Sequence, residues 1–238
     1  FAENLRTGDT AIGEHSYDAA VLSTGGVLNA VDAVMQGSAN RVFCAVRPPG
    51  HHATPDLGMG FCIFNHAAIA ARYAQQEYGV NKVAIVDWDV HCGNGTQVTF
   101  YHDPSVFYFS THQDGLFHCC GASDETGAGE GKGATLNVPL KAGSGDAEIL
   151  AAWEEPLKKV LAGFKPDLII LCAGFDAADG DPLSEMHVTP DGFAALTKLV
   201  CAYADKYCEG RVVSVLEGGY EPTILANCVE AHVKALGV

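Results

Sequence analysis

Two aspartates and a histidine stand at alternate positions in the segment Asp87-Trp88-Asp89-Val90-His91. If the chain stays extended there, the side chains of Asp87, Asp89 and His91 face the same side of a strand end. Carboxylates and an imidazole, with no lysine or arginine within the segment to balance the charge, suit a divalent metal ion. A solvated cap on a strand would use the same residues, so the triplet alone leaves both interpretations open.

A further aspartate, Asp176, follows the apolar run DLIILCAG (167–174). We expect that run to be a strand and Asp176 to emerge at the same edge of the sheet as Asp89 and His91. Asp89, His91 and Asp176 would then be three protein ligands with a position left open for water or substrate, which is typical of catalytic zinc. An Asx turn or a helix cap is the alternative reading of Asp176.

Two adjacent histidines, His51 and His52, lie in the proline- and glycine-rich segment RPPGHHA (47–53). We expect their side chains to diverge, so that both would not bind one metal ion. A general acid/base pair beside a metal-activated water fits better. Asp87 could then accept a hydrogen bond from one imidazole and fix its tautomer.

Tyr220 ends the segment LEGGY (216–220), where paired glycines allow a tight turn. A phenol at this place can donate a hydrogen bond to the oxyanion that forms when water attacks an amide carbonyl. A tyrosine after a strand is more often a packing residue, but its expected place at the metal edge favours the catalytic reading.

Short apolar runs alternate with helical patterns along the chain. The strands are predicted at 41–46, 82–89, 106–111, 167–174 and 211–219, and the helices at 64–78, 146–162, 190–207 and 221–236. Pro156 predicts a kink, and Thr189 with Pro190 predicts the start of a helix. This alternation predicts a single α/β domain with a mostly parallel sheet, helices on both faces, and the active site at the carboxyl ends of the strands.

Composition narrows the class of protein. The 238 residues are 48% hydrophobic and 18% charged, which is typical of one well-buried globular domain. A net charge of −15 argues against direct nucleic-acid binding, because phosphate contacts need clustered Lys and Arg. No apolar run is long enough to span a membrane as a helix, and the N-terminal residues do not resemble a signal peptide. The chain does not begin with Met.

Nine cysteines are scattered without a CxxC pair, and several, such as Cys44, Cys62 and Cys172, lie in apolar runs. This pattern favours a reduced, intracellular setting, and we expect cytoplasmic rather than nuclear localisation. The adjacent pair Cys119 and Cys120 is the one place where a redox role would be sought.

Five blocks together resemble the zinc-dependent histone deacetylase family, most closely its class II and bacterial deacetylase-like amidohydrolase branches. The blocks are RPPGHHA (47–53), GFCIFN (60–65), DWDVHCGNGTQ (87–97), AGFDAADGDPL (173–183) and LEGGY (216–220). They occur in the family's order and cover most of the chain. The resemblance implies an arginase–deacetylase fold over residues 1–238 and hydrolysis of N6-acetyl or other acyl groups from lysine side chains, with release of acetate.

By this resemblance, one Zn²⁺ is bound by Asp89, His91 and Asp176. His52 resembles the general base that activates water and then protonates the leaving amine, while Asp87 orients His51 as its electrostatic partner. Tyr220 would be the oxyanion donor.

The resemblance also implies a substrate tunnel and structural monovalent cations, K⁺ or Na⁺. The tunnel wall is carried over to Gly60 and Phe61, with Phe117 as the opposite wall. Leu183 stands where polyamine-selective class II relatives carry an acidic residue. One cation site is implied at Asp87, Asp89, His91, Ser110 and Thr111, and a second at Phe100, Asp103 and Val106.

Two features depart from the family's pattern. Cys92 stands where the family usually has a second histidine after the zinc ligand, which places a thiol beside the metal site. The family also has an additional N-terminal stretch before the block that begins here, part of which forms a sheet strand and the tunnel rim. We therefore expect the rim to be incomplete.

Three other functions compete with a lysine deacetylase. An acetylpolyamine amidohydrolase shares the catalytic residues, but Leu183 favours acyl-lysine over a charged polyamine. A two-metal ureohydrolase of the arginase type would need further Asp and His ligands. A non-catalytic acyl-lysine binding module would be favoured by loss of Tyr220 or of a metal ligand. The expected partner is an acetylated protein or peptide, without nucleic acid or membrane, and the sequence leaves the oligomeric state open.

Overall fold

The computed structural model describes residues 4–116 and 120–237. Its centre is a sheet of six strands in the order β1-β6-β5-β2-β3-β4, and every neighbouring pair is parallel. The strands are β1 (Arg41–Cys44), β2 (Val83–Asp87), β3 (Val106–Gln113), β4 (Thr135–Leu140), β5 (Leu168–Ala173) and β6 (Val212–Leu216). The predicted α/β fold with a parallel sheet is confirmed.

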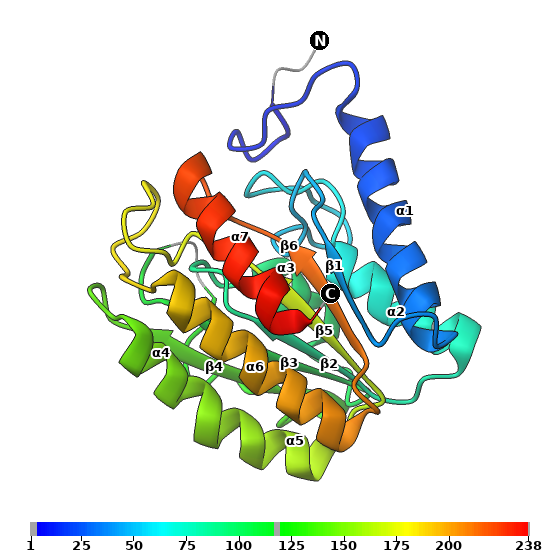
Figure 1. The fold of residues 1–238 in the computed structure, drawn as a ribbon. Coiled ribbons are helices and arrows are strands. Elements are labelled where there is room, and N and C mark those ends of the chain that lie inside the picture. Colours follow the sequence, from blue (N-terminus) through cyan, green and yellow to red (C-terminus); the bar gives the residue numbers. More distant parts are fainter. Residues whose placement is uncertain (1–3, 117–119, 238) are drawn as a thin grey trace.

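Helices cover both faces of the sheet (Figure 1). One face carries α1 (Ser16–Met35), α2 (His66–Tyr78) and α3 (Asn94–Phe100), and the other carries α4 (Asp146–Ala152), α5 (Lys158–Phe164), α6 (Pro190–Tyr207) and α7 (Pro222–Leu236). Two short elements complete the set, the 3₁₀ turn η1 (Gly129–Gly131) and the π-helical turn η2 (Trp153–Leu157). No helix in the described part of the chain is both long and apolar enough to cross a membrane.

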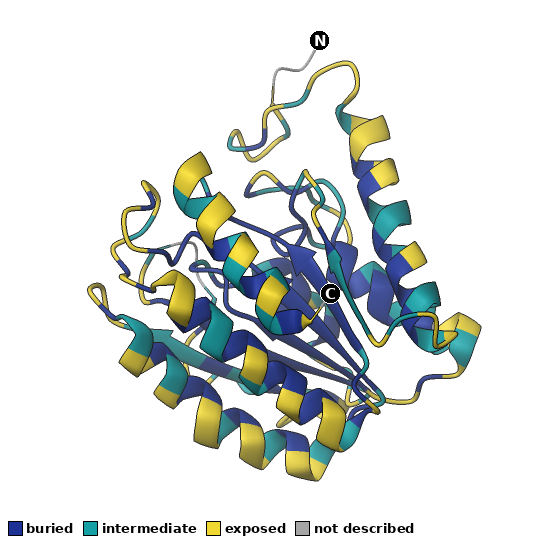
Figure 2. Ribbon diagram, in the orientation of Figure 1, coloured by how far each residue is buried: buried dark blue, intermediate teal, exposed yellow. Residues whose placement is uncertain are grey.

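The sheet is buried between two apolar clusters (Figure 2). Because each strand alternates its side chains between the faces, Ile85 and Ile170 pack towards α1 and α2, whereas Val86 and Leu171 pack towards α4–α7. Strands β2, β5 and β6 are buried at every position, which explains their nearly continuous apolar sequences.

Two α-helices and one strand were not predicted from the sequence. Helix α1 carries Gly25 and Gly26 in its interior, and interior glycines weaken a helix by about 1 kcal/mol each relative to alanine, so its pattern is hard to recognise. Strand β4 contains Pro139, which is tolerated because β4 is the edge strand. Helix α3 is only seven residues long.

The predicted helix signals hold where side chains act as caps. Thr189 accepts a hydrogen bond from the N–H of Gly192, and Pro190 is the first residue of α6, as expected. Pro156, where the sequence predicts a kink, lies inside the π-helical turn that separates α4 from α5, so the predicted helix 146–162 is divided there. Asn65 caps α2 in the same way by accepting from Ala68 N–H. Residues 54–65 separate α2 from the segment RPPGHHA (47–53), which is called the histidine loop below.

Candidate active site

The three predicted metal ligands converge at the carboxyl edge of the sheet. Asp89, His91 and Asp176 each offer a ligand atom, and these atoms lie within 4.8 Å of one another. His91 Nδ1 is 3.1 Å from Asp89 Oδ1 and 3.1 Å from Asp176 Oδ2. Both carboxylates are buried, and in the described residues this is the one His/Cys/Asp/Glu cluster close enough to hold a metal ion.

The negative charge of the two buried carboxylates in this triad favours binding of a cation. Burial, followed by repulsion from Asp89, raises the pKa of Asp176 to about 6. Burial would lower the pKa of His91, but its hydrogen bonds to Asp176 and Asp89 raise that pKa to about 10. The imidazole of His91 therefore keeps its positive charge between the two buried carboxylates. Two carboxylate oxygens with an imidazole nitrogen are a donor set suited to zinc. The residues present fit a divalent metal.

Backbone donors fix the orientation of the carboxylates. Gly218 N–H donates to Asp89 Oδ2 at 2.7 Å, and Val90 N–H donates to Asp176 Oδ1 at 3.0 Å. A side chain at Gly218 would collide with both carboxylates, so only glycine fits there. The turn after β6 thus closes over the triad.

The extended geometry predicted for residues 87–91 is wrong. Strand β2 ends at Asp87, and the chain turns so that Asp89 N–H donates to Asp87 Oδ1 at 3.1 Å. Asp87 Oδ2 instead faces His51 Nδ1 at 3.0 Å and accepts the hydroxyl of Tyr108 at 3.2 Å. Asp87 therefore contacts the histidine loop, and the triad takes its second carboxylate from Asp176.

The two histidines lie side by side, so the expectation that their side chains diverge is also wrong. The ring centroids of His51 and His52 are 4.0 Å apart. His51 contacts Asp87, whereas His52 Nδ1 lies 2.7 Å from Asn94 Oδ1. Because that amide oxygen can only accept, His52 donates from Nδ1 and keeps the lone pair on Nε2.

The surroundings of His51 and His52 shift the pKa values of their imidazoles in opposite directions. Burial alone would lower the pKa of His51, but Asp89 and Asp87 raise it well above its usual value. Burial and then the positive charge of His51 lower the pKa of His52 well below its usual value. A charged and a neutral imidazole side by side are the condition in which the neutral one can accept a proton.

Tyr220 borders the same site. Its backbone N–H donates to Asp181 Oδ2 at 2.7 Å, and the guanidinium of Arg47 lies 5.5 Å from its ring centroid. Burial and the nearby carboxylates of Asp176 and Asp89 raise the pKa of Tyr220, so the phenol stays protonated and can donate.

The structure describes three of the four residues predicted for substrate binding. The side chain of Phe61 is 45% exposed, and its ring lies 5.8 Å from that of Tyr220. Gly60 and Phe61 both have positive φ, and their N–H groups donate to Asp9 Oδ2 and Thr10 Oγ1. Leu183 is 39% exposed. Phe117 lies outside the described residues.

The proposed monovalent-cation residues lie in two places on β3 and beside α3. Ser110 pairs in register with Asp87, and Thr111 Oγ1 accepts the indole N–H of Trp153 at 2.9 Å. Asp103 N–H donates to Phe100 O, and Val106 begins β3. The Asp103 carboxylate forms an ion pair with Arg72. The cation sites stay a prediction.

One pair of cysteines is bonded as a disulfide, which is an exception to the expectation that the thiols are reduced. Cys92, directly after His91, forms a disulfide with Cys120. The sequence pointed to Cys119 and Cys120 as the redox pair, and Cys119 lies outside the described residues. The six free cysteines in the described part of the chain are all buried.

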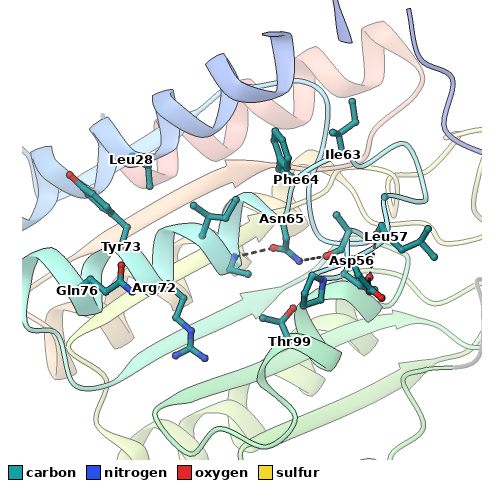
Figure 3. Close-up of a pocket in the computed structure, with 16 residues that line it drawn as sticks. Leu28, Asp56, Leu57, Ile63, Phe64, Asn65, Arg72, Tyr73, Gln76 and Thr99 are labelled. Atoms are coloured by element: carbon teal, nitrogen blue, oxygen red, sulfur yellow. Dashed lines mark hydrogen bonds between the residues drawn. The ribbon is translucent and has the colours of Figure 1, made fainter. Parts of the chain in front are cut away.

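A cavity of about 600 Å³ opens behind the histidine loop, between α1, α2 and residues 53–65 (Figure 3). Asn65 lines it and donates to Ala53 O at 3.1 Å while its carbonyl caps α2, as the dashed lines show. The triad and the histidine rings do not line this cavity. Asn94 borders a second cavity, of about 650 Å³, with Met59 and Cys120.

Sequence reasoning missed two residues at this site. Asn94 binds His52, and its signal was its position three residues after His91 at the start of α3. Glu217, between β6 and Gly218, accepts hydrogen bonds from the histidine loop; it was read only as part of the LEGGY block.

Comparison with known proteins agrees with the family resemblance that the sequence motifs indicate. The histone deacetylase domain family matches residues 2–236. Histone deacetylase 14, chloroplastic, of Arabidopsis thaliana is 40% identical over 235 residues, which are 97% of this chain and 56% of that protein. The histone deacetylase-like amidohydrolase of Pseudomonas aeruginosa is 42% identical over 230 residues, which are 96% of this chain and 60% of the relative.

Among solved structures, the crystal structure of the HDA15 HD domain superposes with a TM-score of 0.90 at 40% identity, covering 95% of this chain and 66% of that one. This chain thus spans a little more than half the length of the two relatives named above. Because the family match extends over nearly every residue and the site lies at the expected edge of the sheet, the chain belongs to the histone deacetylase family.

Proposed function

We propose that this chain hydrolyses the amide of N6-acetyl-lysine, or of lysine carrying a similar acyl group, in proteins or peptides and releases acetate. The observation that carries this proposal is the meeting of three groups at one edge of the sheet. They are the Asp89–His91–Asp176 triad, a neutral imidazole beside a charged one, and a protonated phenol.

A zinc ion held by the triad would act as a Lewis acid towards the amide carbonyl and would make a water molecule more acidic. The chain's contribution is to hold the three ligand side chains in fixed orientations. Gly218 N–H and Val90 N–H do so for the two carboxylates.

His52 is the proposed general base. Its Nδ1–H is committed to Asn94, so Nε2 carries the lone pair that can take the proton of the attacking water. His52 then returns that proton to the nitrogen of the leaving lysine amine. His51, held by Asp87, carries a positive charge that stabilises the negative charge of the attacked carbonyl.

Tyr220 is the proposed oxyanion donor, since its pKa keeps the hydroxyl protonated. A hydrogen bond that strengthens as the carbonyl oxygen becomes negative stabilises the transition state more than the ground state. Arg47 and Asp181 fix the backbone around Tyr220 from two sides.

The choice of acyl-lysine over acetylpolyamine rests on Phe61 and Leu183. The half-exposed ring of Phe61 can bury the methylene groups of a lysine stem. A polyamine carries a further ammonium along this path, and Leu183 offers no charge to offset its desolvation.

Zinc content and turnover of a fluorogenic acetyl-lysine amide test the proposal. We expect Tyr220→Phe to keep the metal and the fold but to lower kcat by roughly 10²–10³-fold, about 3–4 kcal/mol. Unchanged turnover would mean that Tyr220 only packs. A wild-type protein that binds acetyl-lysine peptides but never cleaves them would be a binding module and would refute the enzymatic assignment.

A further inference from the structure

Glu217 is a fully buried carboxylate that the proposed chemistry does not use. It follows the last residue of β6, and its Oε2 accepts the N–H groups of Gly50 at 2.7 Å and His51 at 3.1 Å. No nitrogen or hydroxyl group in the described residues donates to its other oxygen, Oε1, which is buried, and the thiol of Cys172, a weak donor, interacts with this carboxylate. A buried carboxylate with so few donors at one oxygen is costly, so its presence needs a reason.

The two N–H groups that Glu217 binds are the first that the histidine loop has to offer. Pro48 and Pro49 carry no N–H, so Gly50 and His51 supply the first backbone donors after Arg47. The carbonyls of the same two residues bind elsewhere, to Ala53 N–H at 3.0 Å and Thr96 N–H at 3.1 Å. Glu217 therefore links the N–H groups of Gly50 and His51 in the histidine loop to the end of β6.

The loop has little room to move away from Glu217. A Cβ atom at Gly50 would lie 2.7 Å from His66 N and 2.9 Å from Phe64 O, so the loop is pressed against the start of α2. On the opposite side, the carboxylate of Glu217 contacts the backbone of Gly50. The position of His51 along the sheet edge is thus set from both sides.

The contacts between the two loops run in both directions. Arg47, in the histidine loop, donates from Nη2 to the carbonyl of Gly219 at 2.9 Å. Glu217, in the other loop, accepts from the histidine loop, and Gly218 beside it donates to the metal ligand Asp89. Residues 217–219 therefore contact the histidine loop and the triad within three successive positions.

We infer that Glu217 is a positioning residue of the reaction, whose carboxylate holds the backbone of His51, and with it both imidazoles, at a fixed place relative to the metal triad. This inference rests on the proposed function. Displacement of a catalytic group by about 1 Å can lower turnover by about 10²-fold, so loss of this tie should appear in kcat. Burial, the first cause, raises the pKa of Glu217 to about 7, which agrees with a charge kept here at a cost.

Two replacements separate the acceptor from the bulk of the side chain. Glu217→Gln keeps an oxygen that can accept both N–H groups, whereas Glu217→Leu removes the acceptor at similar volume. We expect Glu217→Leu to lower kcat by about 10²-fold with KM and zinc content little changed, and Glu217→Gln to stay within about 5-fold of wild type.

Hydrogen exchange of the segment 47–53 gives a readout that does not need the loaded enzyme. We expect faster exchange at Gly50 and His51 in Glu217→Leu and wild-type protection in Glu217→Gln. If Glu217→Leu does not fold, Glu217→Asp replaces it, because the shorter side chain withdraws the carboxylate from the loop. The expected order of kcat is then wild type, Gln, Asp.

Asp167 provides the matched control. Its Oδ2 also accepts two successive N–H groups, of Asn81 at 3.0 Å and Lys82 at 2.9 Å, but at the opposite end of the sheet. Asp167→Leu should lower the melting temperature and leave kcat per folded molecule unchanged.

The outcomes distinguish the inference from the function beneath it. Normal kcat in Glu217→Leu, or an equal loss in Glu217→Gln and Glu217→Leu, overturns the positioning role. Equal losses of kcat in the Glu217 and Asp167 variants also overturn it, since the effect would then be general destabilisation. A wild-type protein without activity on acyl-lysine refutes the proposed function, and the exchange rates still decide whether Glu217 holds the loop.

Discussion

His232, which is not one of the predicted metal ligands, is predicted to make the stability of the protein depend on pH. It lies on α7 with no exposed surface, between Thr197 of α6 and Ser214 of β6. The hydroxyl of Thr197 donates its proton to Phe193 O, so it can only accept from His232 Nδ1–H at 2.7 Å. Nε2 then accepts the hydroxyl of Ser214 at 2.9 Å, and the neutral imidazole is fully paired.

Charging this imidazole has no compensation. The rings of Phe43, Trp88 and Phe175 surround it, and burial lowers the pKa of His232 to about 4. An unfolded histidine has a pKa of about 6.5, so between these values the unfolded chain binds more protons than the folded one. The free energy of unfolding therefore falls as the pH drops through about 6.5 and stops falling on this account near pH 4.

The size of the effect follows from the two pKa values. At about pH 5, the difference in proton binding destabilises the fold by about 2 kcal/mol relative to about pH 8. Other groups titrate in the same interval, so the comparison needs a variant. His232→Gln keeps an amide that can donate to Thr197 and accept from Ser214, but it does not titrate.

Urea denaturation of wild type and His232→Gln, at both pH values and under the same metal conditions, isolates the contribution of His232. We expect the variant to be less stable at about pH 8 by roughly 1–2 kcal/mol, because it loses ring packing. At about pH 5 the difference in free energy of unfolding between wild type and His232→Gln should shift by about 2 kcal/mol in favour of the variant, because only the wild type loses stability through His232. A gap that is equal at both pH values would refute the reasoning, because His232 would then have the same pKa in both states.

Three further changes test the site and its surroundings. Asp176→Asn should lose zinc, measured by metal analysis, and activity with it; a stoichiometric and active variant would contradict the ligand assignment. Wild type should prefer acetyl-lysine peptides to N-acetylspermidine by about tenfold in kcat/KM, about 1.4 kcal/mol, and Leu183→Glu should narrow that ratio. A wild type that already prefers the polyamine would overturn the substrate assignment and leave the metal chemistry intact. Cys120→Ser should lower the free energy of unfolding by up to about 3–4 kcal/mol, since the disulfide joins residues 28 apart; equal stability before and after replacement would show that the cross-link does not restrain the unfolded chain.

The fold was largely predictable because its signals are local and repeated. Short apolar runs such as DLIILCAG, with flanking helical patterns, favour buried strands, and Thr189 with Pro190 favours a helix start. Helix α1 and strand β4 escaped because Gly25, Gly26 and Pro139 act against their local pattern. Tertiary packing and an edge position overcome those preferences, and neither is visible in a short stretch of sequence.

The residues of the candidate site were predictable from the sequence, but most of their contacts were not. Asp89 and His91 were identified because they lie at the end of the predicted strand 82–89, and Asp176 because it follows the predicted strand 167–174. The error about residues 87–91 arose from extending β2 past Asp87, where the backbone turns to bind its own carboxylate. Asn94 and Glu217 act through a hydrogen bond to a partner more than 40 residues away, and no spacing rule encodes such a pair.

The order of the strands explains why the site is built from such distant residues. Four neighbouring strands, β1, β6, β5 and β2, lie side by side, and each delivers one part of the site at its carboxyl end. The histidine loop follows β1, Glu217 and Tyr220 follow β6, Asp176 follows β5, and Asp87 ends β2. Because all four run in parallel, short turns suffice to bring these groups together, and the backbone N–H groups of those turns bind the neighbouring carboxylates. A mutation in one of these turns should therefore first displace the carboxylate or imidazole that follows the neighbouring strand, because the hydrogen bonds of the turn are made to that group.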